Sequence, residues 1–461
     1  MFKPHIFSSE ILKSCDIRGI VGQELHNTDA YFIGRSFGTS LARLGKRNCA
    51  VGYDGRLSSP EFSEQVVRGL LDTGIDVINL GLVPTPVVYF SVFYLNINSG
   101  LIITASHNPS EYNGFKFLTS EGPFHDSDIQ NLALICENAN YISGQGTLRR
   151  QYIIPEYINY LRSFLKLPFR NDLTIVWDPG NGAIGVVLDL FLEKIPANNI
   201  VICGEVDGHF PHHHPDPSLE ENVEMLCNKV KETGADLGIA FDGDGDRIAI
   251  VDSEGYIFQG DQLLTIFARD FLKQNPGETI MSEVKASKFF YDDVVENGGI
   301  PLMWKVGHTN QKEKMKQENI GLAGETSGHI FFRENSAYDD ALFAAVKLLN
   351  ILGSSRKSIT EMRKEFPVYH DSGEIRVILG TEERRRVMTE ITGRLQKAGR
   401  DFIGIDGIRI SCGDGFWMIR GSNTQPHLTI RCEAASKPGL EHCLKDMWIQ
   451  LALSGIKSKT V

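Results

Sequence analysis

Short runs of β-branched and aliphatic residues alternate along this chain with longer segments whose apolar residues recur at helical spacing. Residues 48–55, 172–180 and 235–243 each fit a buried strand that ends in Asp and Gly, whereas residues 59–74 and 263–275 carry the helical pattern. Strands that alternate with helices are typical of α/β proteins, in which the sheets are largely parallel. The alternation therefore predicts an α/β fold, and the three similar strand endings hint at a repeated unit.

The length of the chain predicts several domains. It has 461 residues, of which 42% are hydrophobic, and this is too long for a single core. We expect three similar α/β domains with mixed sheets, followed by a smaller α+β domain. Interruptions of the pattern place these predicted domains at residues 1–150, 151–254, 255–366 and 367–461.

The charge balance excludes some classes of partner. Acidic side chains number 58 against 47 basic ones, for a formal net charge of -11, which argues against a nucleic-acid or anionic-membrane surface. The eight cysteines form no CxxC pair, as expected for free thiols in a reducing compartment. The N-terminus lacks the apolar core of a signal peptide, and the apolar stretch 341–353 is short and contains Lys347. We expect a soluble cytoplasmic protein, a monomer or weak dimer.

The stretch "ITASHNPSEYNGFK" places a serine in a polar turn after a buried strand. An Asn-Pro pair at residues 108–109 and an Asn-Gly pair at residues 113–114 predict a turn that holds Ser106 together with His107 and Lys116. A serine in such a loop is a candidate nucleophile when a base and a charge-stabilising group stand near it. An ordinary Ser-Asn-Pro turn explains these residues equally well, so other segments must decide.

Three carboxylates separated by glycines follow the strand at 237–241. Asp242, Asp244 and Asp246 can converge on one hard cation because the glycines permit a tight turn, and Mg²⁺ is the natural inference. The EF-hand pattern fails, because its sixth and twelfth positions hold Arg247 and Ser253 here. A solvated acidic turn is disfavoured by the buried strands on both sides. Arg247 suggests that an anion is brought to the metal.

The stretch "AGETSGHIFF" suits the recognition of sugar hydroxyls. The carboxylate of Glu325 can accept hydrogen bonds from vicinal hydroxyls, and Ser327 and His329 add donors in the same turn. A helix cap is the competing interpretation of Glu-Thr-Ser-Gly.

The stretch "IRGSNTQPHLTIR" gathers hydrogen-bond donors between two predicted strands. A phosphate dianion could be held there without a metal, and a Ser- and Asn-rich β-turn is the alternative. The donors are Arg420, Ser422, Asn423, Thr424 and Arg431.

Two further patterns suggest other functions. Gly180, Gly182 and Gly185 form a GxGxxG array after a strand, with Glu205 about 20 residues later, as in dinucleotide-binding proteins. Such arrays also occur wherever a strand meets a helix closely, and nothing else indicates hydride transfer. The histidine-rich loop at residues 209–214 suggests zinc, but its interleaved prolines predict an extended loop without supporting partners, and hence incidental metal binding.

Taken together, the motifs "TASHNP", "DGDGDR", "GETSGH" and "RGSNTQP", with "CDIRG" and "GHT" at residues 307–309, appear in one order over nearly the whole chain. In this respect the chain resembles the α-D-phosphohexomutases, most closely the bacterial phosphomannomutase/phosphoglucomutase group. The resemblance implies four domains around a central active-site cleft, with Ser106 phosphorylated and also a ligand of Mg²⁺ beside the three aspartates. It further implies that Glu325 and Ser327 bind the sugar hydroxyls and that the 420–424 loop with Arg431 holds the phosphate that is not transferred.

The implied reaction interconverts hexose 6-phosphate and hexose 1-phosphate, of mannose and also of glucose, through a hexose 1,6-bisphosphate that turns over in the cleft. The metal, Lys116, Arg247 and Arg18 would face the transferred phosphoryl group. Lys116, His107 and His308 are unranked candidates for the general acid or base, and Lys285 and His308 are expected to line the cleft. Reorientation of the intermediate favours a C-terminal domain that opens and closes.

Alternatives remain at this point. A Mg²⁺-dependent sugar-phosphate phosphatase would use the same nucleophile and metal, and a non-catalytic phosphosugar-binding protein would be expected to lack Ser106 or an aspartate. Three positions depart from the common pattern of the group and bear on the choice of sugar. These are Cys15, Thr326 and Gln425.

Overall fold

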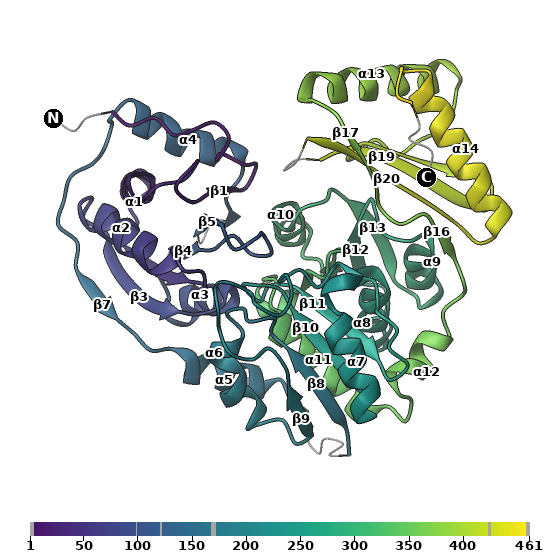
Figure 1. Cartoon of the computed structure of the whole chain (residues 1–461), viewed down its shortest axis with the longest axis horizontal. Helices are drawn as coiled ribbons and strands as arrows, with labels where there is room; N and C mark the ends of the chain where they lie inside the picture. Colours follow the sequence, from purple (N-terminus) through teal and green to yellow (C-terminus); the bar gives the residue numbers. More distant parts are fainter. Residues whose placement is uncertain (1–3, 98, 120–121, 167–171, 423–425, 458–461) are drawn as a thin grey trace.

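A computed structural model describes residues 4–97, 99–119, 122–166, 172–422 and 426–457. Within these ranges the strands form four sheets, which follow one another along the chain (Figure 1). The strands of each sheet fall inside one of the four predicted domains, whose boundaries stay a prediction. No helix in the described ranges combines the length and apolarity needed to cross a membrane.

The first sheet has the order β1-β5-β4-β2-β3-β7, with β6 paired to β5. Strands β2, β3, β4 and β7 run parallel, whereas β5 is antiparallel to β4 and to β1. Its strands are β1 (Asp16–Ile20), β2 (Asn48–Tyr53), β3 (Asp76–Leu82), β4 (Ser99–Ile103), β5 (Tyr112–Thr119), β6 (Gly122–Pro123) and β7 (Leu148–Arg150). The helices around it are α1 (Asn27–Arg43), α2 (Ser59–Leu71), α3 (Thr85–Tyr94) and α4 (Asp126–Glu137).

The second and third sheets are smaller and share one plan, with orders β11-β10-β8-β9 and β13-β12-β14-β15. The second has β8 (Thr174–Asp178), β9 (Asn198–Val201), β10 (Leu237–Phe241) and β11 (Ile248–Asp252), with α5 (Ile154–Ser163), α6 (Gly185–Leu192) and α7 (Glu224–Thr233). The third has β12 (Thr279–Glu283), β13 (Ile300–Trp304), β14 (Leu322–Gly324) and β15 (Ile330–Phe332), with α8 (Gly260–Gln274), α9 (Lys288–Glu296), α10 (His308–Glu318), α11 (Ala341–Ser354) and α12 (Ile359–Lys364).

The fourth sheet has the order β16-β20-β19-β18, with β17 also paired to β20, and all of its pairings are antiparallel. It confirms the expectation of an α+β C-terminal part. Its elements are β16 (His370–Asp371), β17 (Ile375–Ile378), β18 (Ile408–Cys412), β19 (Gly415–Gly421), β20 (His427–Ala434), α13 (Thr381–Lys397) and α14 (Lys437–Ala452).

The first three sheets repeat one arrangement. A central strand (β2, β8 or β12) pairs in parallel with β4, β10 or β14, which then turns into antiparallel β5, β11 or β15. The sheets are therefore mixed, as expected, with parallel pairing that ends at this antiparallel edge. The hint of a repeat also needs correction: Asp54 and Asp178 end equivalent central strands, whereas Asp242 follows the next strand, β10. The third unit has Glu283 at the central-strand position.

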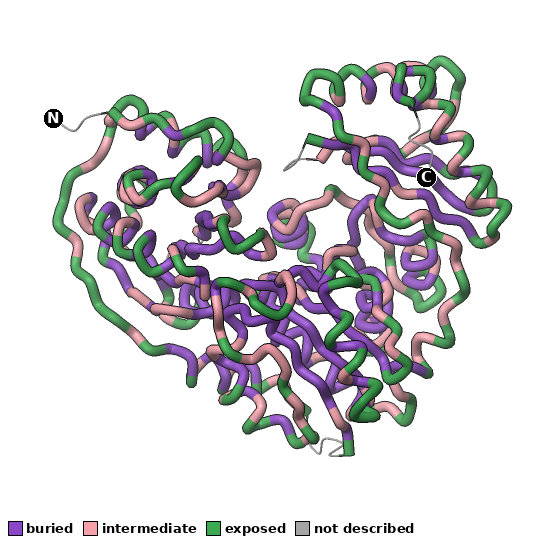
Figure 2. The backbone as a smooth tube through the Cα atoms, in the orientation of Figure 1, coloured by how far each residue is buried: buried purple, intermediate pink, exposed green. Residues whose placement is uncertain are grey.

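Hydrophobic packing separates the C-terminal sheet from the rest. One continuous core joins side chains of all three α/β units, such as Val88, Trp177 and Phe343. The fourth sheet has a core of its own around Trp417. Figure 2 shows the buried strands of the middle sheets running through the centre of the molecule and a second buried layer under α13 and α14. Because its core is separate, the C-terminal part can move without breaking the larger core.

Candidate active site

Each of the four predicted motifs lies at a connection between two antiparallel strands. Residues 104–111 join β4 to β5, residues 242–247 join β10 to β11, residues 325–329 join β14 to β15, and the last loop joins β19 to β20. Asn423, Thr424 and Gln425 of the last loop lie outside the described residues. The repeated plan of the sheets thus puts the first three motifs at equivalent places in three units.

Ser106 lies at the boundary of the first and second units. Its backbone has a φ of 50°, in the left-handed region, and its amide donates a hydrogen bond to Thr104 Oγ1 over 2.8 Å. Its hydroxyl donates to Asp242 Oδ2 over 2.7 Å and lies 3.3 Å from His107 Nδ1. A strained, buried serine held against an acidic loop is typical of a functional site rather than of a surface turn.

The expectation that Lys116 shares this turn is wrong. The Asn-Gly pair at 113–114 and Lys116 all belong to β5, which pairs antiparallel with β4. Lys116 Nζ instead donates to Asp244 Oδ2 over 2.7 Å and to Asp246 Oδ2 over 2.5 Å. Burial alone would lower the pKa of Lys116, but the two carboxylates hold it above its ordinary value, so the side chain stays charged.

Arg56, which the sequence analysis missed, organises the serine loop. Its guanidinium donates to the backbone carbonyls of Ser106, Asn108, Pro109 and Tyr112 over 2.6 to 2.9 Å. Arg18 adds a hydrogen bond of 2.6 Å to Asn108 Oδ1. The sequence predicted the strand that ends at Asp54 and Gly55 but assigned no role to the arginine that follows them.

The three aspartates meet the structural requirements of a cation site. Asp242 Oδ1 accepts three backbone N–H groups, from residues 245, 246 and 247, over 3.0 to 3.1 Å, and this curls the loop around it. Carboxylate oxygens of Asp242, Asp244 and Asp246 lie within 4.8 Å of one another. Oδ1 of Asp244 and Oδ1 of Asp246 are buried without a hydrogen-bond partner. Buried, unpaired carboxylate oxygens that face one another are what a hard cation such as Mg²⁺ binds.

Repulsion between the carboxylates of this cluster persists despite its basic neighbours. Burial, and then Asp246 and Asp244, raise the pKa of Asp242 well above its ordinary value. Arg247 Nε lies 3.8 Å from Asp242 Oδ2, and Lys116 lies against the other two carboxylates. Like-charged carboxylates this close repel each other unless a cation is added. The residues therefore fit a divalent ion.

Two stacked histidines of the third unit face the acidic loop. Arg247 Nε donates to His329 Nε2 over 2.9 Å, and His329 Nδ1 lies 3.0 Å from Asp339 Oδ2. The His308 ring stacks on that of His329 with centroids 5.5 Å apart. His329 thus contacts the acidic loop at residues 242–247. The sequence had grouped it with the carboxylate of Glu325 instead. Asp339 had no sequence signal, because it follows β15 outside every motif.

The predicted sugar loop has a buried carboxylate, Glu325, that is influenced by the charges of Glu283 and Lys285. Glu325 is buried, and its Oε1 accepts the Gly307 amide over 2.6 Å while Oε2 accepts the Ser327 hydroxyl over 3.3 Å. Burial and then Glu283 raise the pKa of Glu325. Lys285 Nζ lies 3.4 Å from Glu283 Oε1. Acceptors for hydroxyl groups and one cation for a phosphate thus lie close together.

The predicted phosphate loop is only partly brought together. Arg420 Nε donates to Asp406 Oδ2 over 3.2 Å, and the same oxygen accepts the amide of Val306, next to the "GHT" segment. Asp406 therefore links Arg420 to the third unit. Arg431 lies on the paired strand β20, two residues from Thr429, which is the register partner of Arg420. Its guanidinium contacts Asp371, Glu433 and Asp261, and it donates to the carbonyl of Lys285.

The glycine array serves packing. A Cβ at Gly182 would lie 2.8 Å from the carbonyl of Gly243, and one at Gly185 would lie 2.3 Å from the carbonyl of Gly204. Gly182 lets the turn after β8 approach the acidic loop, and Gly185 lets α6 approach the segment after β9. The array leaves no room at these two positions for a dinucleotide phosphate.

The prediction that the histidine-rich loop lacks partners is wrong. His212 Nδ1 lies 2.7 Å from Asn181 Oδ1, and His213 Nε2 lies 3.1 Å from Asp178 Oδ2. This loop is tied to the end of β8.

Comparison with known proteins decides the family. Four profiles of one family match in order: phosphoglucomutase/phosphomannomutase alpha/beta/alpha domain I at residues 9–141, domain II at 155–255, domain III at 259–369 and the C-terminal domain at 374–448. The chain belongs to the phosphoglucomutase/phosphomannomutase family. The resemblance inferred from the motifs is thereby confirmed.

Relatives in this family align over nearly their full length. The chain is 40% identical to a phosphomannomutase/phosphoglucomutase of Pseudomonas putida, over 96% of each sequence. It is 38% identical to a phosphoglucomutase of Neisseria gonorrhoeae, over 94% of each. A crystal structure of a phosphoglucomutase/phosphomannomutase family protein from Burkholderia thailandensis superposes with a TM-score of 0.92 at 32% identity, over 98% of this chain and 99% of that one. The four-part fold is the fold of the family.

We expect His308 to make this family member less stable in acid. Burial and the Lys312 cation lower the pKa of His308 well below its ordinary value, against the raising effect of Asp339. The unfolded chain binds a proton at this position below pH about 6.5, whereas the folded chain does not until a lower pH, so stability falls as pH drops. The loss begins as the pH falls below about 6.5 and grows until the folded chain also binds the proton.

The measurement is urea unfolding at the two ends of this window, near pH 7.5 and pH 5, for the protein and for His308→Gln. The variant should lose less stability between the two pH values than the unmodified protein does. His442→Gln, at an exposed position on α14, should behave like the unmodified protein. Equal pH dependence in His308→Gln and the unmodified protein would show that folding does not lower the pKa of His308.

Proposed function

We propose that the chain is a phosphohexomutase that interconverts the 6-phosphate and 1-phosphate of mannose and of glucose through a hexose 1,6-bisphosphate. The observation that carries the proposal is the 2.7 Å hydrogen bond from Ser106 Oγ to Asp242 in the acidic cluster. This contact puts a candidate phosphoryl carrier beside a candidate cation site. The carrier comes from the first unit and the cation site from the second. The family membership supports it, as do relatives named for mannose, for glucose and for both sugars.

In the proposed reaction the phosphoserine transfers its phosphoryl group to the free hydroxyl of a hexose monophosphate. The bond from phosphorus to Ser106 Oγ breaks and a bond to the sugar oxygen forms. The bisphosphate then turns over, and its other phosphoryl group returns to Ser106. Positioning and charge neutralisation dominate such a transfer. Arg18, Lys116 and Arg247 supply positive charge around the transferred group.

Asp242, Asp244, Asp246 and the oxygen carried by Ser106 would hold the proposed Mg²⁺. A bound Mg²⁺ neutralises charge on the transferred phosphoryl group and orients it. The hexose 1,6-bisphosphate would serve both as intermediate and as activator, because it can phosphorylate Ser106 anew.

His107 is the proposed proton partner of Ser106. Its Nδ1 is 3.3 Å from the hydroxyl oxygen, and burial, Arg247 and Arg18 lower its pKa well below the ordinary value. A neutral imidazole can accept the hydroxyl proton when Ser106 attacks a phosphate and return it in the reverse step. Lys116 is charged and held by two carboxylates, which makes it a poorer base. His308 lies beside Cys15, with Nε2 3.9 Å from its Sγ, and is proposed to line the sugar site.

The sugar would be read by Glu325, Ser327 and Lys285, and its distal phosphate by Arg420 and Ser422 with Asn423 and Thr424. Arg431 joins this anchor only if its guanidinium leaves the carboxylates that hold it here. His329, between Arg247 and Asp339, would orient Arg247 toward the transferred group.

The phosphatase alternative is less well supported. The family membership and the names of the relatives favour a mutase. A phosphatase also has no use for a second phosphate anchor on another sheet. We further propose that the protein works in the cytoplasm as a monomer or weak dimer, without nucleic-acid or membrane partners. All eight cysteines are free, in keeping with a reducing compartment.

A coupled assay with Mg²⁺ and a trace of hexose 1,6-bisphosphate tests the proposal. Mannose 1-phosphate and glucose 1-phosphate are both expected to yield 6-phosphate, without release of free phosphate. Turnover of one sugar alone would show that the enzyme is specific for that sugar. Thr326 and Cys15 would then be the candidate determinants of the specificity. Free phosphate without isomerised sugar would establish the phosphatase instead.

A further inference from the structure

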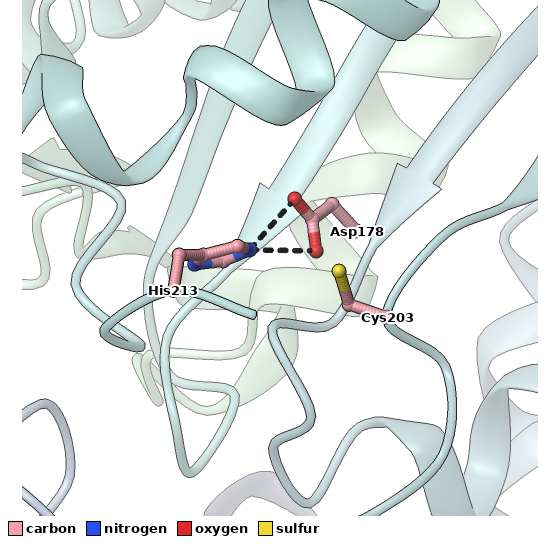
Figure 3. Close-up of side chains that lie close together, drawn as sticks. All are labelled: Asp178, Cys203 and His213. Atoms are coloured by element: carbon pink, nitrogen blue, oxygen red, sulfur yellow. Dashed lines mark hydrogen bonds and ion pairs between the residues drawn. The ribbon is translucent and has the colours of Figure 1, made fainter. Parts of the chain in front are cut away.

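A second cluster of metal-binding side chains lies in the second unit, outside the catalytic loops. Asp178 ends β8, Cys203 follows β9, and His213 lies in the histidine-rich loop (Figure 3). One potential ligand atom from each of these residues lies within 4.8 Å of the others. His213 Nε2 is 3.1 and 3.2 Å from the two oxygens of Asp178. Two ligands of a tetrahedral zinc ion are separated by about 3.3 Å, so this spacing needs little adjustment.

The orientation of each side chain suits a cation. His213 Nδ1 lies 3.0 Å from the carbonyl of His214, which fixes the ring with Nε2 facing the cluster. Such a carbonyl partner on the second ring nitrogen is the usual arrangement of metal-bound histidine. Asp178 Oδ1 accepts the Gly180 amide over 2.9 Å, which orients the carboxylate. Cys203 is partly exposed, and Figure 3 shows its sulfur directed toward the carboxylate and the imidazole.

Comparison of the three repeated units shows that Asp178 lacks a permanent countercharge. Asp54 and Glu283 end the equivalent central strands and are buried like Asp178. Arg56 lies 3.1 Å from Asp54, and Lys285 lies 3.4 Å from Glu283, each two residues after its carboxylate. A buried carboxylate needs such a partner.

The second unit has Gly180 at this position. It has a φ of 55°, and a Cβ there would lie 3.1 Å from His213 Cε1. Gly180 therefore has no cationic side chain to pair with Asp178, and its lack of a side chain makes room for the imidazole of His213. Within the described residues, the basic group at ion-pair distance from Asp178 is His213. The countercharge can come from a metal ion.

We propose that Asp178, Cys203 and His213 bind a divalent cation of the zinc class, with a water as the fourth ligand. A thiolate, an imidazole and a carboxylate together favour Zn²⁺ over Mg²⁺, because Mg²⁺ prefers oxygen ligands. The site is separate from the acidic cluster, which offers only oxygen. It does not rest on the proposed mutase activity.

The position of the site indicates a structural role. Two residues after His213, the carbonyl of Pro215 accepts the amide of Gly243, within the acidic loop, over 3.2 Å. A cation would join β8, the segment after β9 and the histidine-rich loop. It would thereby hold in place the segment that hydrogen-bonds to the acidic loop. Binding to the folded chain alone raises its stability.

The competing interpretation is an imidazolium–carboxylate ion pair that needs no metal. Burial disfavours the charged ring, but hydrogen bonds with Asp178 and Cys203 raise the pKa of His213 to about 10. Both interpretations keep Asp178 neutralised. They differ in whether the Cys203 sulfur bonds to a metal, and spectroscopy can detect that bond.

Cobalt substitution tests the proposal on the full-length protein. Stripped, reduced protein titrated with Co²⁺ should develop the near-ultraviolet absorption of a thiolate–Co²⁺ bond, and one equivalent of Zn²⁺ should abolish it. Cys203→Ser and His213→Ala should lose the band or weaken binding at least about 100-fold. Cys227→Ser, in α7 of the same unit, and His209→Ala, exposed in the same loop, are the matched controls and should retain it.

Two further measurements keep the test independent of folding and of the catalytic metal. Asp242→Asn should retain the cobalt band, because the acidic cluster is not involved. Zn²⁺ should slow alkylation of Cys203 in the unmodified protein, as followed by peptide mass spectrometry. Absence of the band, a band that survives Cys203→Ser, or alkylation unaffected by Zn²⁺ would overturn the proposal in favour of the ion pair.

Discussion

Ser106→Ala is expected to lower kcat by about 10⁴-fold or more, because no other described side chain could carry the phosphoryl group at this place. The serine hydroxyl donates to Asp242 Oδ2 and is buried at the junction of two units. Its removal leaves the sugar and phosphate contacts intact, so the affinity for hexose phosphate should change little. The coupled mutase assay gives kcat, and calorimetry or fluorescence titration gives affinity.

Ser110→Ala is the matched control for this variant. Ser110 lies in the same loop but is exposed, so its loss should leave turnover unchanged. Intact-mass spectrometry after incubation with hexose 1,6-bisphosphate should show one added phosphoryl group in the control and none in Ser106→Ala. Near-normal turnover of Ser106→Ala would refute the phosphoserine assignment.

Asp242→Asn should have the second large effect, a fall in kcat of about 10³-fold or more, because the charge that holds the cation and faces the phosphoserine is reduced. The fold should tolerate the change. Asparagine keeps one carbonyl oxygen to accept the three backbone amides that Asp242 Oδ1 binds. It also removes a buried charge that repels Asp244 and Asp246.

These two effects separate a role in metal binding from a role in folding. Without added metal, the thermal midpoint of Asp242→Asn should equal or exceed that of the unmodified protein. The rise in midpoint that Mg²⁺ gives the unmodified protein should disappear. Asp189→Asn, at an exposed position on α6, should preserve both turnover and the Mg²⁺ effect. A large loss of stability in metal-free Asp242→Asn would instead assign the carboxylate to the fold.

Local patterns were enough to predict the class of fold and the motifs. Continuous apolar runs such as 237–241 are buried on both faces. Their sequence therefore predicts a strand without reference to the rest of the chain. Glycines between aspartates likewise predict a tight acidic loop, because the turn depends on the residues within it. Ser106, Asp242 and Glu325 were found in this way.

The partners of these residues came only from the tertiary structure. Lys116 and Asp244 are 128 residues apart, and their contact depends on the pairing of β4 with β5 and on the packing of the first unit against the second. Arg56, after β2, contacts the serine loop that follows the neighbouring strand β4, and Arg431 proves to be held by carboxylates.

The same limit applies to the histidine-rich loop. Its histidines were evident in the sequence, but Asp178 and Cys203 lie 35 and 10 residues away from His213 and follow two different strands. The sequence determined which chemical groups the chain carries and the local turns that present them. Only the packing of strands and units decided which groups meet, because a contact between distant residues leaves no periodic pattern in either segment.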